Sequence, residues 1–228
     1  MELIGPSGAS GLARALRLNY RLTYLDLQYN AISDSGAAAI AEALKSNCTL
    51  TDLCLIENKI GESGGEAIGK ALQSNCTLTH LILGGNRIGD SGAKAIAKAL
   101  QSRGTQLTIL GLSSNKISCS GATAIADSLQ CNCSLTQLGL SRNEIGSSGA
   151  VAFAKALQSN CTLTHLDMQD NDNNDSGATE LAQAPLHHNN TLIYLDLESN
   201  PIGSLGRDIL GELSKHWSCT VKYDRPQD

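Results

Sequence analysis

The sequence contains very few aromatic residues: one Trp, one Phe and five Tyr make up 3% of its 228 residues. A core must therefore be built from Leu, Ile and Ala. Only 17% of the residues are charged, and the formal net charge is −5. This balance argues against a nucleic-acid partner, because general binding to the phosphate backbone requires clustered Lys and Arg.

Long apolar runs are also missing. No stretch approaches the roughly 18 consecutive apolar residues of a transmembrane helix, so we expect no membrane partner. The first residues, Met-Glu-Leu-Ile-Gly, lack the basic start and the apolar stretch of a secretory signal. We therefore expect a cytoplasmic protein.

What the sequence does contain is an internal repeat. The pattern Leu-x-x-Leu-x-Leu-x-x-Asn begins at residues 22, 50, 78, 107, 135, 163 and 192, and a Gly follows each Asn by six positions. Within a unit, the alternation around Leu25 and Leu27 predicts a short strand with one buried face. From Gly36 the spacing of Ile40 and Leu44 predicts a helix.

A strand and a helix in every unit predict a parallel sheet backed by helices. Paired strands lie about 4.8 Å apart, whereas packed helices need roughly 8–10 Å, so the sheet should line the concave face of a curved stack. We expect the repeated Asn to turn inward and bond backbone groups, and Asp34 or Ser35 to cap its own helix. The repeated Gly fits either a close approach or an unusual φ.

The unit at residues 78–100, Leu-Thr-His-Leu-Ile-Leu-Gly-Gly-Asn-Arg-Ile-Gly-Asp-Ser-Gly-Ala-Lys-Ala-Ile-Ala-Lys-Ala-Leu, resembles a ribonuclease-inhibitor-type leucine-rich repeat. It is most similar to the repeats of NOD-like receptors, and the recurring Ser-Asn-Cys-Thr-Leu at 46–50, 74–78 and 159–163 strengthens the likeness. Ran GTPase-activating proteins share the unit. The resemblance implies an α/β leucine-rich-repeat solenoid, a right-handed horseshoe with a parallel sheet on the concave face and helices on the convex face.

We expect a single domain over residues 1–228. It comprises a partial first repeat at 1–21, seven repeats starting at the positions given above, and a C-terminal cap at about 216–228 with a last strand near 219–223 and a Trp at 217. A start inside a repeat favours a fragment or truncated gene over a helix acting as a modest cap. The sixth repeat is irregular, because Asn173 replaces a recurring Ile and Pro185 should break the helix. We expect it to be the least stable repeat.

Four of the eight cysteines occupy one position in the repeat. They are Cys48, Cys76, Cys133 and Cys161. We interpret them as inward-facing thiols that act as small apolar residues. The same position creates Asn-Cys-Thr/Ser sequons, which we interpret as by-products of the repeat.

Several motifs resemble known sites but lack residues or spacing that those sites require. The stretch from Gly64 to Lys70 lacks the Ser/Thr of a phosphate-binding loop and falls on a predicted helix. The Asn-rich stretch 170–175 lacks the Gly and Glu of a calcium loop. His80 and His165 lie three strands apart, about 14 Å at the usual spacing. We therefore expect no catalytic residue, no metal, no cofactor and no enzymatic activity.

The residues on either side of the strand leucines point outward and vary between repeats. We expect an apolar patch of Cys54, Ile56, Ile82 and Ile109, a shallow, featureless middle at Gly111 and Gly139, and an acidic, aromatic patch near the C-terminal end. The expected partner-binding residues are Tyr24, Asp26, Cys54, Ile56, Ile82, Ile109, His165, Asp167, Tyr194, Asp196 and Glu198. The alternative is that the isoleucines are repeat drift or abut a missing neighbouring domain.

These features predict a non-catalytic scaffold that recognises a protein partner on its concave face, of the NOD-like receptor type. The alternative is a GTPase-activating protein or regulator of a Ran-like small GTPase, which the absence of a strongly acidic tail disfavours. A ribonuclease inhibitor would be expected to have a more acidic and aromatic concave surface than the middle strands of this chain provide.

Overall fold

The computed structural model of the chain describes residues 3–187, 189, 191–216 and 219–224. Within these residues, eight helices alternate with eight strands of three residues each. The helices are α1 (Gly5–Leu18), α2 (Ser33–Leu44), α3 (Glu62–Leu72), α4 (Gly89–Leu100), α5 (Cys119–Leu129), α6 (Gly146–Leu157), α7 (Asp175–His187) and α8 (Ser204–His216). The strands are β1 (Tyr24–Asp26), β2 (Asp52–Cys54), β3 (His80–Ile82), β4 (Ile109–Gly111), β5 (Gln137–Gly139), β6 (His165–Asp167), β7 (Tyr194–Asp196) and β8 (Thr220–Lys222).

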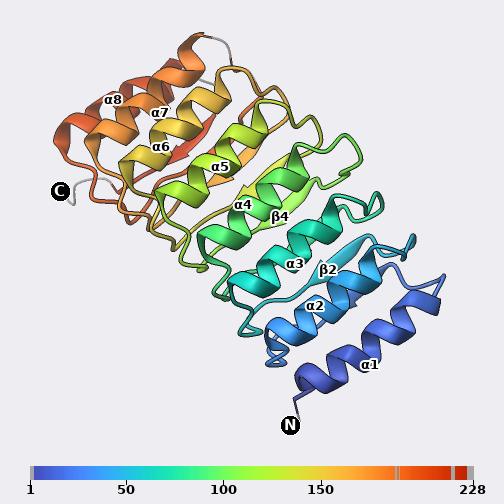
Figure 1. Cartoon of the computed structure of the whole chain (residues 1–228). Coiled ribbons are helices and arrows are strands. Elements are labelled where there is room, and N and C mark those ends of the chain that lie inside the picture. The colour runs from blue at the N-terminus through green and yellow to red at the C-terminus, as the bar shows by residue number, and fades with distance from the viewer. Residues whose placement is uncertain (1–2, 188, 190, 217–218, 225–228) are drawn as a thin grey trace.

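The strands form one sheet in chain order, and every neighbouring pair is parallel. In Figure 1 the helices lie side by side in chain order, with the sheet behind them. Helices need more room than paired strands, so the sheet occupies the concave face. The predicted α/β solenoid is confirmed. Among the described residues, no helix has both the length and the apolar character needed to cross a membrane.

The interior consists of stacked layers of Leu, Ile and Ala. In the second repeat Leu53 and Leu55 from the strand side meet Ile68 from α3, and all three are at most 1% exposed. Small residues bring the helices close together: a Cβ at residue 69 would lie 2.5 Å from the backbone carbonyl carbon of Ala95 in α4. Gly69 is therefore a packing residue, as its place on the predicted helix indicated.

The repeated Asn forms a ladder between neighbouring repeats. The amide nitrogen of Asn58 donates to the carbonyls of Leu27 and Ile56 at 2.7 and 2.9 Å, and its Oδ1 accepts from the backbone N–H groups of Asn30 and Ile32 at 3.1 and 3.3 Å. Each such Asn satisfies backbone groups that helix and strand leave unpaired. The predicted inward-facing role is confirmed.

The prediction that Asp34 or Ser35 caps its own helix is wrong. Asp34 does not cap α2; its Oδ1 instead accepts from the backbone N–H groups of Gly61 and Gly64 at the start of α3. Asp90 and Asp175 make the same contact with the helix of the following repeat. Because these carboxylates stand inside the first turn of their own helices, they reach the free N–H groups of the next helix.

The repeated Gly permits a close approach and has no unusual φ. Gly64 and Gly92 are helical and lie outside the residues with positive φ. A Cβ at either position would come within 2.6 or 2.5 Å of the Cγ2 methyl of the Ile four residues earlier, Ile60 or Ile88. Of the two explanations that the sequence left open, the close approach is the right one.

A second Asn ladder runs along the opposite edge of the sheet. The amide nitrogen of Asn75 donates to the carbonyls of Leu44 and Asn47 at 2.8 and 3.2 Å, and its Oδ1 accepts from the N–H groups of Thr77 and Leu78. Asn75 is only 5% exposed. The sequon asparagines are thus structural, which gives the sequons a physical reason.

The cysteines that follow these asparagines point outward, so the inward-facing interpretation is wrong. Cys48, Cys76, Cys133 and Cys161 are all exposed free thiols. The physical reason is the Asn ladder itself: because Asn75 takes the inward position of the turn, the side chain of the next residue faces solvent.

The sixth repeat contains an unpaired buried amide. Asn173 is fully buried, and neither its Oδ1 nor its Nδ2 has a hydrogen-bond partner. The neighbouring Oδ1 of Asn171 is also unpaired, whereas the equivalent oxygen of Asn143 accepts from Asn115 at 2.9 Å. The expectation that Pro185 breaks the helix is wrong: α7 continues to residue 187, since a proline in the last turn removes one hydrogen bond without ending the helix.

At the two ends, α1 precedes the first strand, and β8 completes the sheet where the sequence places a last strand. Leu22, beside the open edge of β1, is 37% exposed, whereas its equivalent Leu50 is fully buried. The expected contribution of Trp217 lies outside the described residues. The domain boundaries themselves stay a prediction.

Candidate binding surface on the sheet

Three columns of side chains run across the outer face of the sheet. The strand register places Tyr24, Asp52, His80, Ile109, Gln137, His165 and Tyr194 in the first column, and Asp26, Cys54, Ile82, Gly111, Gly139, Asp167 and Asp196 in the second. The third column follows each strand and contains Gln28, Ile56, Gly84, Ser113, Ser141, Gln169 and Glu198. The register is the one that the 28-residue spacing predicts.

Charge is segregated onto this face. Its three columns contain five carboxylates and no Lys or Arg from β1 to β7, although the chain has 17 basic residues. The carboxylates are those of Asp26, Asp52, Asp167, Asp196 and Glu198. The nearest cation along the second column is Lys222 on β8, beyond the last acidic residue. The face as a whole therefore attracts positive charge.

The apolar patch is less exposed than the sequence suggested. Cys54, Ile56, Ile82 and Ile109 are all half-buried. Ile82 lies over Gly111, because a Cβ at residue 111 would be 3.2 Å from both Cδ1 and Cγ2 of Ile82. Burial also raises the pKa of the Cys54 thiol. The patch is a compact ridge beside the glycine pair.

A hollow of about 280 Å³ lies beside that ridge, between β4 and β7. It is lined by Ile109, Leu110, Gly111, Gln137, Leu138, Gly139, His165, Asp167 and Tyr194. Gly111 and Gly139 pair directly across β4 and β5 and form its floor. The middle that the sequence described as featureless is therefore a recess with chemically distinct walls, and it joins the apolar ridge to the acidic, aromatic patch.

Asp196 is already paired within the patch. Its Oδ2 accepts from the hydroxyl of Tyr194 at 2.7 Å and lies 3.7 Å from Nζ of Lys222, and its Oδ1 accepts from the N–H of Glu198. Lys222 also lies 5.3 Å from the centre of the Tyr194 ring. The bond to Asp196 and burial raise the pKa of Tyr194. With Asp196 only 6% exposed, this cluster fixes the wall of the hollow.

Asp167 is the carboxylate that lines the hollow. Burial is the main cause of its raised pKa, and the charge of Asp196 adds to it, against the N–H of Gln169 that donates to Oδ1 at 3.0 Å. Beside it the rings of His165 and Tyr194 lie 5.7 Å apart, centre to centre. A half-buried carboxylate between an aromatic wall and an apolar ridge is suited to receiving a cation.

Seven of the eleven expected site residues do not line the hollow, and Tyr24 and Asp26 are the two farthest from it along the sheet. Tyr24 and Asp26 are on β1, at the opposite end of the sheet from β7. Tyr24 is 59% exposed, and its hydroxyl donates to Asp26 at 3.4 Å. The structure therefore separates the expected surface into two regions. His165, Asp167, Tyr194 and Ile109 line the hollow, while Tyr24 and Asp26 stand alone.

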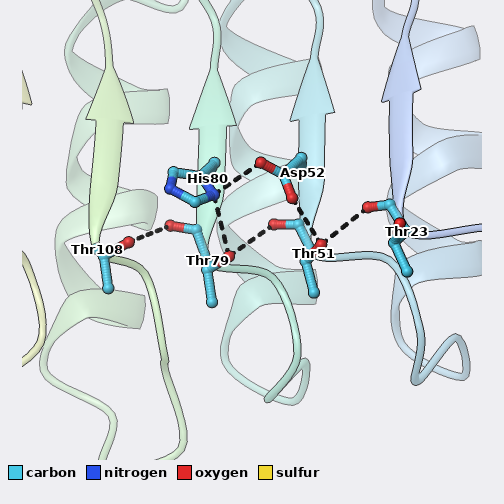
Figure 2. Close-up of polar contacts among 6 residues, drawn as sticks. All are labelled: Thr23, Thr51, Asp52, Thr79, His80 and Thr108. Atoms are coloured by element: carbon cyan, nitrogen blue, oxygen red, sulfur yellow. Dashed lines mark hydrogen bonds and ion pairs between the residues drawn. The ribbon is translucent and has the colours of Figure 1, made fainter.

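The sequence prediction missed a polar pair on β2 and β3. Nδ1 of His80 lies 2.7 Å from Oδ1 of Asp52, and the hydroxyls of Thr51 and Thr79 contact the two side chains (Figure 2). Figure 2 also shows the threonine hydroxyls bonding backbone carbonyls of the preceding repeat, as when Thr79 donates to Thr51 at 3.1 Å. The 28-residue spacing of Asp52 and His80 was a sufficient signal for the pair.

In the part of the chain that the structure describes, no three His, Cys, Asp or Glu side chains gather in a way that could hold a metal ion. In the Asn-rich stretch 170–175, Asp175 bonds the N–H groups of Gly203 and Gly206. Its carboxylate is used for joining repeats.

A curved stack of strand–helix units with a variable sheet face defines the class of leucine-rich repeat proteins. The family model for the leucine-rich repeat matches residues 22–41, 46–69, 74–97, 105–126, 131–154, 159–182 and 188–208. These matches cover more than half of the chain, and the protein belongs to the leucine-rich repeat family. Repeats of this family generally form non-catalytic scaffolds for protein–protein interaction.

Among solved structures, the chain is similar to "Leiomodin-1 Actin-Binding Site 2 (ABS2)", with 17% identity, a TM-score of 0.44, and coverage of 89% of this chain and 85% of that one. No curated protein matches the chain.

Proposed function

We propose that the protein recognises a protein partner through the concave sheet face, with the hollow between β4 and β7 as the centre of contact. The hollow is the main support for this proposal. Gly111 and Gly139 lie side by side on two neighbouring strands and have no side chains, and the residues around them have larger ones. Variable outward columns on a regular scaffold supply the rest of the surface.

The dimensions of the face support a macromolecular partner. Eight paired strands at about 4.8 Å extend over roughly 34 Å, a length that suits a macromolecular partner better than a small molecule. The hollow, at about 280 Å³, is smaller than the roughly 300–1,000 Å³ of small-molecule pockets. It has room for one side chain of a larger ligand.

Filling the hollow tests the proposal. A Cβ at residue 139 would meet no atom closer than 3.5 Å, so Gly139→Leu should fold while occupying the recess. Gly11→Leu on α1 is the matched control, because nothing lies within 4 Å of its new Cβ. Partners are captured by cross-linking and mass spectrometry with both variants. We expect Gly139→Leu to lose the partner that the native chain and Gly11→Leu retain; equal capture by all three would refute the proposal.

The finer assignments are also proposals. Recognition of the NOD-like receptor type rests on the likeness of residues 78–100 to those repeats. Regulation of a Ran-like small GTPase is the alternative, since the same unit occurs in Ran GTPase-activating proteins. GTP hydrolysis by Ran, measured with and without the protein, separates the two: an accelerated rate favours the alternative.

A reducing, cytoplasmic location is proposed on two observations. The described cysteines are free thiols, and most are exposed. A glycan on Asn75 would remove an amide hydrogen that bonds the neighbouring repeat. Fractionation of cells that express the protein tests the location, and a glycosylated, secreted form would contradict it.

A further inference from the structure

We propose that the hollow receives the cationic side chain of an Arg or Lys from the partner protein, with Asp167 as the carboxylate that binds it. This inference rests on the proposed function and specifies its partner chemistry. It concerns one recess on the sheet and one inserted side chain.

The walls fit the apolar stem of such a side chain. Arg and Lys bury their methylene groups along apolar surface while the charged end finds polar partners. Ile109 forms the apolar side of the hollow, and the glycines at 111 and 139 leave its floor open to the stem. Tyr194 also lines the hollow, and its ring already has Lys222 over it, 5.3 Å from the ring centre.

The charges near the hollow select a cation. Asp167 is the carboxylate that lines it, Asp196 lies on the next strand, and Glu198 lies two residues beyond the end of that strand. The neighbouring cation, Lys222, contacts Asp196 and the Tyr194 ring, and it stands one strand further away from Asp167. Lys222 therefore leaves Asp167 without a direct ion pair.

Asp167 has capacity for another donor. A carboxylate offers about four acceptor positions, and the N–H of Gln169 occupies one of them at 3.0 Å. An incoming guanidinium or ammonium would replace lost water with a charge-assisted bond. An apolar side chain would bury the carboxylate unpaired, and an anion such as a phosphate would face three carboxylates.

A peptide titration tests the inference directly. The probes are the pentapeptide acetyl-Gly-Ser-Arg-Ser-Gly-amide, its Lys equivalent, and a citrulline equivalent that keeps the shape of Arg without its charge. Binding is followed by the amide ¹H–¹⁵N shifts of Gly111 and Gly139, up to about 10 mM peptide, where millimolar binding is visible. We expect the Arg or Lys peptide to shift both amides and the citrulline peptide to leave them unchanged.

Two carboxamide variants complete the test. Asp167→Asn keeps the acceptor for Gln169 and removes the charge, and we expect it to weaken binding at least about tenfold. Asp127→Asn is the same change on the exposed part of α5, away from the sheet, and should bind as the native chain does. Equal shifts with citrulline, no shifts at all, or unchanged binding by Asp167→Asn would each overturn the inference.

The outcomes separate this inference from the proposed function. Loss of the partner in Gly139→Leu with unchanged partner binding in Asp167→Asn would keep the concave recognition site and reject the cationic side chain. Partner binding that survives Gly139→Leu would reject the site itself.

Discussion

Gly149 and Ile145 lie four residues apart at the start of α6, and the Cγ2 methyl of Ile145 occupies the space that a Cβ on residue 149 would need. The same relationship joins Gly64 to Ile60 in α3. Each repeat thus couples a β-branched core residue to a helix position without a side chain. Gly lowers the intrinsic stability of the helix, but at this position it makes room for the Ile side chain in the core.

This relationship predicts opposite effects for two Gly→Ala substitutions. Gly149→Ala should destabilise the protein by about 1–3 kcal/mol, because the new methyl overpacks the contact with Ile145. Gly11→Ala, which meets no atom within 4 Å, should stabilise α1 by about 0.5–1 kcal/mol. Urea unfolding measures both. A stabilising Gly149→Ala would show that close packing is not the reason for the glycine.

The sequence predicted the repeating features well because each obeys one period. The alternation around Leu25 and the spacing of Ile40 gave the strands, helices and register of the sheet. Features that join one repeat to the next were harder to predict. Asp34 caps α3, the helix of the next repeat, and Cys76 faces outward because Asn75 bonds the preceding repeat. Both features depend on contacts between repeats, which the alternation or helical spacing inside one repeat does not reveal.

The candidate site shows the same limit. The outward positions of Asp167 and Tyr194 follow from the register, but the hollow depends on the relative heights of neighbouring side chains. Gly111 and Gly139 were described as featureless because a missing side chain carries no chemical signal in a sequence. The pairing of Asp196 with Lys222 required the position of β8.

The carboxylate that joins α4 to α5 predicts a pH-dependent effect. Burial alone would raise the pKa of Asp90, but hydrogen bonds from the hydroxyl and N–H of Ser118 and from the N–H of Gly121 outweigh it, so the pKa is lowered. A lowered folded-state pKa means that the stabilisation is fully present above the ordinary value of about 4. It is lost as the pH falls through the folded-state value.

We expect Asp90→Ala to destabilise the protein by about 1–2 kcal/mol at pH 7, the usual worth of a helix N-terminal cap. The difference from the native chain should shrink below about pH 4. Asp127→Ala, on the exposed part of α5, should change stability by no more than about 0.5 kcal/mol. Urea midpoints at both pH values provide the measurement, and a pH-independent loss for Asp90→Ala would contradict the assigned cause.

The buried amide of the sixth repeat predicts a stabilising substitution. Asn173→Ile removes a polar group that has no partner and restores the residue found in the other repeats, so we expect a gain of about 1–3 kcal/mol. Amide hydrogen exchange in α7 should slow in parallel. The mirror variant, Ile117→Asn, should lose at least as much. A lower melting temperature for Asn173→Ile would contradict the unpaired amide as a source of instability.

The cysteines predict a pattern of chemical reactivity. Burial raises the pKa of Cys219 to about 12, so its thiol should stay protonated and protected in the folded protein. The exposed thiols of Cys48, Cys76, Cys133 and Cys161 should alkylate first. A short iodoacetamide pulse at about pH 8, near the ordinary thiol pKa, followed by peptide mass spectrometry gives the order. Labelling of Cys219 as fast as Cys76 would contradict the burial of Cys219, and slow labelling of Cys76 would contradict its outward orientation.

The raised pKa of Asp167 predicts that the residue costs stability. Burial first, and then the charge of Asp196, disfavour its ionised form in the folded protein. The cost is therefore present at pH 7, where the carboxyl is ionised in the unfolded chain, and disappears as the pH falls below the ordinary value of about 4. Asp167→Asn should accordingly raise the free energy of unfolding at pH 7, and the gain should vanish in acid. Denaturant curves at both pH values measure this, with Asp26→Asn as the exposed control.

The stability of Asp167→Asn bears on function because the same variant is expected to bind the Arg or Lys peptide more weakly. Asp167 lowers the stability of the free protein at neutral pH and lies in a hollow that a protein partner can reach. Its presence is explained if its carboxylate forms an ion pair with the partner's cationic side chain. The two measurements are independent, since one follows unfolding of the free protein and the other follows peptide shifts. A variant that is both less stable and unchanged in binding would make Asp167 an ordinary structural residue of β6.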